Sequence, residues 1–148
     1  MFPAAQAKPE QQNYLFRLAC AYRRLRWKRE GLAVVAKALE LIDETGGSVF
    51  GPACYHLKGD MLLIEDAGNE SEAQHCFRAA IQMARAQGAK TSELEAATSL
   101  ARLLDKQGKR DEARTTLAEI YGWFTEGFDT ATLKDAKVLL DELSTREA

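Results

Sequence analysis

The side chains best suited to metal chemistry are two cysteines and two histidines that lie close together in the sequence: Cys54, His56, His75 and Cys76. Two cysteines with two histidines are a common ligand set for tetrahedral zinc. Cys54 and His56 are two residues apart on an expected helix, however, and His75 and Cys76 are adjacent, so neither pair shares a helix face. We therefore expect no metal site, and we interpret Cys76, beside Phe77, as a small core residue.

The carboxylates make no stronger case for catalysis. Six of them are scattered along expected helices with no nucleophile or base beside them: Glu44, Asp60, Glu65, Asp66, Glu95 and Asp105. Acid–base and nucleophilic catalysis need such groups within hydrogen-bonding reach of one another. The phosphate-binding pattern G-x-x-x-x-G-K-[ST] is also missing. The sequence therefore predicts a chain that is not an enzyme and that holds no cofactor.

A basic segment near the N-terminus is the strongest charge feature. Between Tyr14 and Arg29 there is no acidic residue, and there are six basic ones: Arg17, Arg23, Arg24, Arg26, Lys28 and Arg29. Interleaved aromatic residues, such as Tyr22 and Trp27, are typical of surfaces on which nucleic-acid bases stack. On a helix, however, Tyr22 falls on the core-facing side. The arginines then form a solvated face or a patch for an acidic partner, and nucleic-acid binding is the weaker alternative.

The composition favours an all-α domain. Of 148 residues, 46% are hydrophobic and only three are proline, and strong helix formers such as Ala, Leu, Glu and Lys are abundant. No apolar run approaches the roughly 18 residues that a membrane-spanning helix needs. Three cysteines without a C-x-x-C pattern fit a reducing compartment, so we expect a cytoplasmic protein without membrane contact.

The hydrophobic periodicity predicts seven helices after a flexible arm over residues 1–9. The expected helices span about 10–28, 30–44, 52–66, 71–87, 92–107, 111–121 and 130–143. Ser71-x-x-Gln74 and Ser92-x-x-Glu95 read as capping boxes that open the fourth and fifth helices. Gly88 and Gly108 suit the positions just after two helix ends. Asp129 or Thr130 is expected to cap the last helix.

Small residues recur about every forty positions. Ala19, Gly59 and Ala101 are 40 and 42 residues apart, and each is expected at a close crossing of two paired helices. The partner helices repeat a second pattern of small and bulky positions: Gly31, Ala73 and Ala113, followed by Val35, Phe77 and Leu117. Antiparallel helices approach closely only where one side chain is small. Gly59 and Ala73 are 14 residues apart rather than 12, which predicts two extra residues in the turn near 67–70.

This pattern resembles tetratricopeptide repeats, whose usual period is about 34 residues. The resemblance implies a right-handed α-α superhelix of about three helix pairs, over residues 10–45, 50–88 and 92–122, with a capping helix at about 130–144. Over residues 30–145 the chain also resembles the C-terminal tails of large bacterial multidomain signalling proteins. The stretches that carry this likeness are YHLKGD (55–60), AQGAK (86–90), EAATSLARL (95–103) and YGWFTEGFDT (121–130).

In those proteins such a tail follows an ATPase module, which is itself preceded by a cyclase or a DNA-binding domain. The resemblance implies an interaction or scaffold module whose concave groove binds a peptide or protein. Packing on the parent protein's own domains, or dimerisation, is the alternative. Projecting the repeat's groove positions onto this chain gives Asn13, Phe16, Arg17, Cys20, Arg23, Arg24, His56, Asp60, Leu63, Glu95, Thr98, Arg102 and Asp105.

The aromatic segment from Tyr121 to Phe128 is irregular and has two interpretations. Its exposed rings could form a docking patch for a partner. A terminal repeat also needs a cover for its apolar end, and this segment with the last helix could supply it. We favour the cover.

Overall fold

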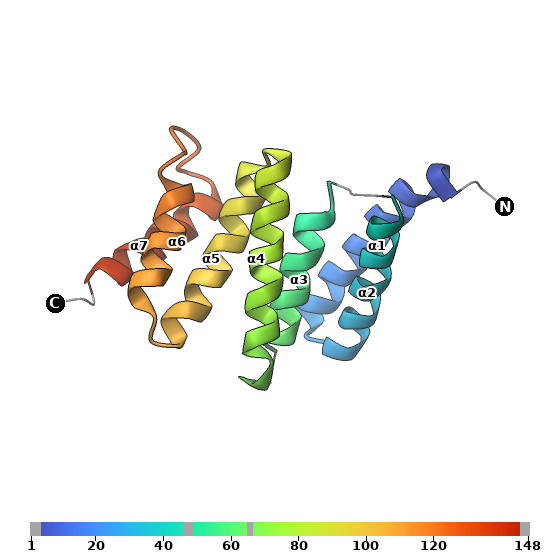
Figure 1. The fold of residues 1–148 in the computed structure, drawn as a ribbon, viewed down its shortest axis with the longest axis horizontal. Helices are drawn as coiled ribbons and strands as arrows, with labels where there is room; N and C mark the ends of the chain where they lie inside the picture. Colours follow the sequence, from blue (N-terminus) through green and yellow to red (C-terminus); the bar gives the residue numbers. More distant parts are fainter. Residues whose placement is uncertain (1–3, 46–48, 65–66, 146–148) are drawn as a thin grey trace. The chain divides into compact units, whose positions relative to one another are not determined.

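The computed structural model describes residues 4–45, 49–64 and 67–145 of the chain (Figure 1). Over these residues the chain is all-α, as the sequence predicts, and no strand is formed. The helices are α1 (Ala4–Leu25), α2 (Lys28–Thr45), α3 (Gly51–Leu62), α4 (Glu70–Gln87), α5 (Lys90–Lys106), α6 (Arg110–Tyr121) and α7 (Ala131–Thr145), with a 3₁₀ turn, η1 (Ala67–Asn69), before α4. The η1 turn lies where the sequence predicts two extra residues.

The chain divides into two compact units, Met1–Ala80 and Ile81–Ala148. We refer to them as unit 1 and unit 2. Because the boundary falls inside α4, the first part of that helix belongs to unit 1 and its last two turns belong to unit 2. Each unit is described separately.

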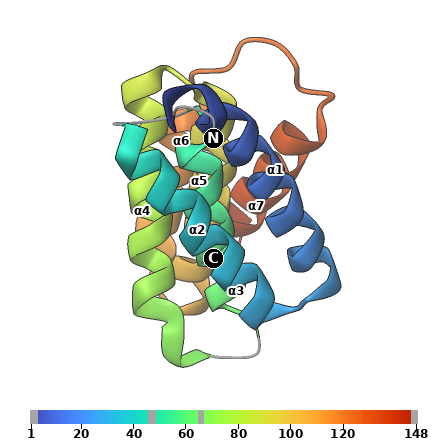
Figure 2. The same cartoon turned by 90° about the vertical axis from the view of Figure 1, so that its right-hand side faces the viewer.

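Unit 1 is built on α1, α2 and α3, which pack on one another (Figure 2). The tight turn after Leu25 makes α1 and α2 antiparallel, and the two helices pack on each other. One buried cluster fills the space between the three helices: Ala19, Val35, Ala38, Leu39, Ile42, Cys54, Leu57, Met61 and Ile64. The pairing of helices in sequence order, which the periodicity predicts, is therefore present in this unit.

Glycine makes two close contacts possible in unit 1. Gly59 of α3 lies against the ring of Phe77 in α4, and a Cβ atom placed on Gly59 would come within 2.4 Å of Phe77 Cε1. Gly31 of α2 lies against the end of Met61, where a Cβ atom would come within 2.5 Å of the methionine Cε. Phe77 and Met61 are completely buried. The small residues at these positions are thus needed for the helices to approach.

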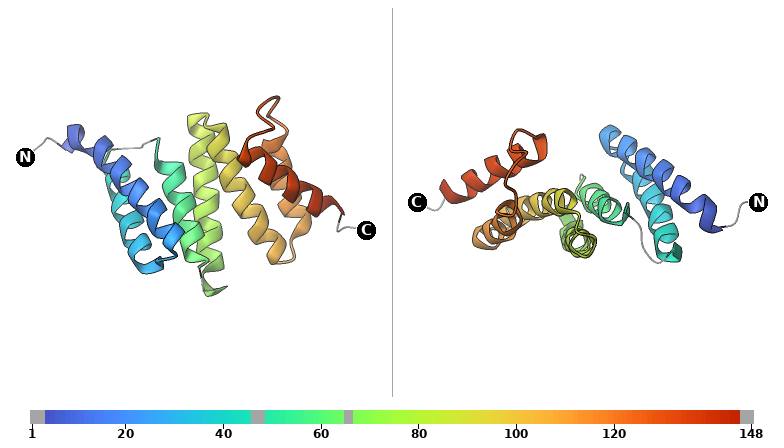
Figure 3. Two further views of the ribbon diagram at one scale, coloured as in Figure 1. Left: turned by 180° about the vertical axis from the view of Figure 1, so that it is seen from behind. Right: turned by 90° about the horizontal axis from the view of Figure 1, so that it is seen from above.

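Unit 2 pairs α5 with α6, and α7 packs on both of them (Figure 3). The side chains that fill this core recur at helical spacing, and Ala101 and Ala113 are among the small ones with no exposed surface. Its largest completely buried side chains are Leu94, Leu100, Leu104, Leu117 and Leu143. The last helix therefore covers apolar surface of the α5–α6 pair, as expected for a terminal cover.

Three helix ends share one backbone arrangement. Gly88 and Gly108 have φ of 69° and 83°, and the residue after each donates its N–H to the carbonyl oxygen five positions earlier, at 2.8 Å. These bonds supply donors to carbonyl groups that have no hydrogen-bond partner within the last turn of the helix. Arg26, after α1, has the same arrangement with φ of 59°, and Trp27 N–H donates to Tyr22 O at 3.0 Å. The two helix ends predicted at Gly88 and Gly108 are confirmed. At the end of α1 the same position is occupied by Arg26.

Several predicted helix ends are wrong. Residues 4–9, assigned to a flexible arm, belong to α1, where alanine favours helix although Pro9, in the second turn, disfavours it. Ser92 does not open α5, since the helix starts at Lys90 and Glu93 N–H already donates to Ala89 O. Likewise α4 starts at Glu70, before Ser71. The third helix ends at Leu62, and its expected last residues, 65 and 66, lie outside the described part of the chain.

We predict that Gly59→Ala destabilises the protein although alanine is the better helix former. The overlap with the rigid Phe77 ring should cost about 1–3 kcal/mol, which exceeds the ~1 kcal/mol gain in helix propensity. Gly31→Ala should cost less, because the flexible end of Met61 can turn aside. Urea unfolding measures both. Equal stability of Gly59→Ala and the parent protein would contradict the crossing, and Phe77→Leu should restore part of the loss.

We also predict that Arg26→Gly stabilises the protein. A non-glycine residue in the left-handed region costs about 1–2 kcal/mol, part of which is offset by the greater freedom of glycine in the unfolded chain. A net gain of about 0.5–1 kcal/mol in the free energy of unfolding is expected. Arg24→Gly, inside the last turn of α1, is the matched control and should lose stability. A lower urea midpoint for Arg26→Gly would contradict this reading.

Candidate functional site

In unit 1, residues of α1 and α3 far apart in the sequence meet in a salt bridge. The guanidinium Nη1 of Arg23 donates to Asp60 Oδ2 at 3.0 Å. His56 Nε2 lies 3.5 Å from the same oxygen, one turn earlier on α3. The first helices of the two expected pairs are therefore neighbours, and Arg23, His56 and Asp60, three of the predicted groove residues, come together. The positive charge of Arg23 is compensated inside the unit.

A shallow cleft of about 370 Å³ opens beside this salt bridge. Arg23, Asp60 and Leu63, which the sequence predicts as groove residues, line it together with Arg26 and Ile64. Arg26 was not predicted as a groove residue, because a left-handed arginine at a helix end cannot be foreseen from residue type. The cleft therefore combines cationic, anionic and apolar walls.

The other predicted groove residues of α1 differ in exposure. Asn13, Arg17 and Arg24 are exposed, whereas Phe16 and Cys20 are half-buried against the core of unit 1. The Phe16 ring packs on Phe50, with 5.7 Å between ring centroids. Phe16 therefore contributes to the packing of unit 1.

In unit 2 the predicted groove residues lie on α5. Glu95 and Arg102 are exposed and Asp105 is half-buried. Thr98 is 5% exposed, and its hydroxyl donates to Leu94 O at 2.8 Å within the same helix. Since its only hydroxyl proton is used there, Thr98 cannot present a donor to a partner.

The basic segment of α1 presents apolar side chains to solvent as well as charge. Tyr14 is 65% exposed, Leu25 55% and Trp27 52%. Tyr22, in contrast, is half-buried against the core, as the helical pattern predicts, and its ring packs on Trp27 with centroids 5.7 Å apart. The segment therefore has a core-facing side and an outer side that carries both arginines and large apolar groups.

The cysteines and histidines do not converge. Cys54 and Cys76 are buried free thiols, Cys20 is a half-buried free thiol, and His75 is exposed. Within the described ranges, no group of three His, Cys, Asp or Glu residues could hold a metal ion. Cys76 is a small core residue beside Phe77, as predicted. The His56 ring packs edge-on against the Phe77 ring, with 5.8 Å between the ring centroids, and so helps to fix α3 on α4.

Unit 2 contains a buried carboxylate that the sequence analysis did not single out. Glu93, 3% exposed, accepts a hydrogen bond from Arg85 Nε at 2.9 Å, and Lys90 Nζ lies 3.6 Å from its other oxygen. Lys90 Nζ also lies 5.5 Å from the centroid of the Trp123 ring. A buried charge is tolerated only when it is paired. The pairs with Arg85 and Lys90 therefore link α4, α5 and the loop after α6.

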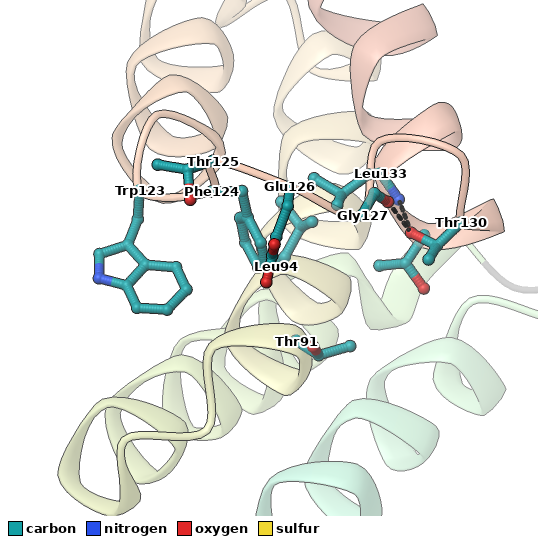
Figure 4. A pocket seen from close by; sticks show the side chains of 10 residues that line it. Thr91, Leu94, Trp123, Phe124, Thr125, Glu126, Gly127, Thr130 and Leu133 are labelled. Atoms are coloured by element: carbon teal, nitrogen blue, oxygen red, sulfur yellow. Dashed lines mark hydrogen bonds between the residues drawn. The ribbon is translucent and has the colours of Figure 1, made fainter.

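The aromatic segment between α6 and α7 forms the wall of a pocket of about 430 Å³ (Figure 4). Leu94 of α5 and Leu133 of α7 supply its apolar base, and Trp123, Phe124 and Glu126 come from the loop. Thr130 holds the far end of the loop: its hydroxyl donates to Gly127 O at 2.8 Å and accepts from Leu133 N–H at 3.4 Å. Thr130 is thus the predicted cap of α7. The loop covers Leu133, as expected of a cover, yet Trp123 is 57% exposed, as expected of a docking patch. The aromatic segment therefore has features of both interpretations.

Comparison with known proteins does not place the chain in a family: no family model matches it, and no curated protein is significantly similar to it. Among the helices described, none is long and apolar enough to cross a membrane.

We predict that Cys54 resists alkylation in the folded protein. Burial raises the pKa of its thiol from 9.0 to about 12, and the neighbouring Cys20 adds to the shift. Because the thiolate is the reactive form, ionisation alone should slow the reaction at pH 8 by roughly a thousandfold. Mass spectrometry after iodoacetamide treatment should show Cys20 labelled before Cys54. Equal labelling of both residues would contradict the burial.

The same shift predicts how stability depends on pH. Since the pKa of Cys54 is higher in the folded state, the free energy of unfolding should keep its full value below pH 9 and fall between pH 9 and 12.

Proposed function

We propose that the chain is a non-catalytic interaction module of tetratricopeptide-like helix pairs, and that the outer face of α1 binds an acidic segment of a partner protein. The observation that carries the proposal is the composition of that face. Exposed Arg17 and Arg24 stand beside exposed Tyr14 and Leu25, and no acidic residue interrupts the segment up to Arg29.

Helix geometry puts these side chains in two adjacent stripes. Arg17 and Arg24 are seven residues apart, so they lie within about 20° of each other around the axis, and Tyr14 and Leu25 lie within about 20° as well. The two stripes are separated by roughly 80°. A partner segment with carboxylates on one side and apolar groups on the other can contact both stripes at once.

The arginines that face solvent differ from Arg23 in their partners. Arg23 is held by Asp60, whereas no described residue forms an ion pair with Arg17 or Arg24. Guanidinium groups bind carboxylates through two parallel hydrogen bonds, which are stronger than bonds between neutral groups. Arg17 and Arg24 are therefore the side chains that we assign to partner binding, while Arg23 and Asp60 fix α1 on α3.

The repeat pattern supports the interaction role. The small residues expected at helix crossings, Ala19, Gly59 and Ala101, are all buried. Such stacked pairs expose side chains of their first helices, and repeat proteins use these as binding surfaces. The resemblance of residues 30–145 to tails of multidomain signalling proteins supports the same role.

The test uses a fluorescein-labelled peptide of alternating glutamate and leucine and measures its fluorescence polarisation. Arg17→Glu with Arg24→Glu should weaken binding about tenfold or more, because two charge-assisted contacts become repulsive. The control is Lys37→Glu with Arg78→Glu, which changes the charge of unit 1 equally at exposed positions on α2 and α4. The control should bind nearly as well as the parent protein.

Two outcomes would reject the proposal. Equal losses in both double variants would mean that only the net charge matters. Tighter binding of a single-stranded oligonucleotide than of the acidic peptide, lost in Arg17→Glu with Arg24→Glu, would assign the face to nucleic acid instead.

A further inference from the structure

The pocket beside the aromatic loop of unit 2 has walls suited to a small organic molecule. Its volume of about 430 Å³ lies within the range of small-molecule sites. The apolar side chains of Leu94, Phe124 and Leu133 form the interior, and Thr91 and Thr132 place hydroxyl groups at the first turns of α5 and α7. In Figure 4, Phe124 and Glu126 extend from the loop in the same direction, toward the start of α5.

Two aromatic rings meet at a right angle at this pocket. Trp123 and Phe124 have an interplanar angle of 87°, with 5.2 Å between their centroids. Their π faces carry partial negative charge, which attracts cations. The position of Lys90 Nζ, 5.5 Å from the Trp123 centroid, shows that an ammonium group already occupies such a place on this ring.

Glu126 is the charged side chain of the pocket wall. Among the described residues, no cation is paired with it. Other charges nearby are compensated: Arg85 and Lys90 both lie beside the buried Glu93 in the first turn of α5, and Arg85 Nη2 also lies 3.8 Å from Glu119 Oε2. The first turn of α7 would favour an anion, but Thr130 Oγ1 already accepts one of its N–H groups. The net electrostatic preference of the pocket is therefore for a positive ligand.

We propose that this pocket binds a small organic cation, in which an aromatic or aliphatic body carries an ammonium group. The body packs on Leu94, Phe124 and Leu133, and the ammonium group lies between the carboxylate of Glu126 and the aromatic corner. This site does not involve the α1 face, and the proposal for it does not depend on the function proposed for that face.

A matched series of three probes tests the proposal: phenethylamine, 2-phenylethanol and 3-phenylpropionate. They share one ring and differ in charge. The protein has two tryptophans, so Trp27→Phe leaves Trp123, in the pocket wall, as the only indole reporter. Quenching or shift of its fluorescence gives the affinities. Phenethylamine should bind about fivefold more tightly than the alcohol, and the anion should bind most weakly.

Glu126→Gln should abolish the preference for the cation and leave binding of the alcohol unchanged. Asp129→Asn, an exposed carboxylate of the same loop that does not line the pocket, is the control and should keep the preference. Circular dichroism checks that both variants fold. Equal affinities for the three probes, tighter binding of the anion, or an unchanged preference in Glu126→Gln would overturn the proposal.

N-acetyl-lysinamide separates a small ligand from a lysine side chain on a partner protein. It carries the same ammonium group on a thin aliphatic stem that fills less of the pocket. We expect it to bind more weakly than phenethylamine. Tighter binding of N-acetyl-lysinamide would overturn the assignment of the pocket to a small molecule.

Discussion

The packing of unit 1 depends on the absence of a side chain at Gly59. The Phe77 ring occupies the space that a Cβ atom would need, and it is completely buried there. Because protein interiors are close-packed, this one contact fixes how near α3 and α4 can lie. His56, one turn earlier on α3, meets the same ring edge-on, so a residue predicted to line the groove also takes part in the packing.

The second constraint is electrostatic and belongs to unit 2. Burying the Glu93 carboxylate carries a desolvation cost that only nearby cations can offset. Arg85 and Lys90 come from the end of α4 and the start of α5, so their pairs with Glu93 fix the turn at Gly88. Lys90 in turn lies on the Trp123 ring, which links the buried carboxylate to the wall of the pocket.

The sequence predicted the features that depend on one residue type in a fixed pattern. Gly88 and Gly108 take the left-handed conformation at helix ends, Thr130 caps α7, and the small residues at forty-residue spacing are buried. It could not predict features that depend on which of several possible hydrogen bonds or backbone conformations the folded chain adopts. Ser92 has the capping pattern, yet the helix already begins two residues earlier at Lys90. Arg26 takes a conformation that its type disfavours, because Trp27 N–H can then close the end of α1.

The candidate site residues show the same limit. Residue type identified the arginines of α1 as a group, but not which of them are already used within the fold. Asp60, 37 residues away, compensates Arg23 and leaves Arg17 and Arg24 facing solvent. In unit 2, Glu93 is paired with Arg85 and Lys90, whereas Glu126 lines a pocket and has no ion pair with any of the residues that the structure describes. A charged side chain that is paired within the fold contributes to stability. A charged side chain that has no such pair can select a partner. For this reason the residues that we propose for binding follow from the pairing pattern, which the fold sets, and not from the local sequence.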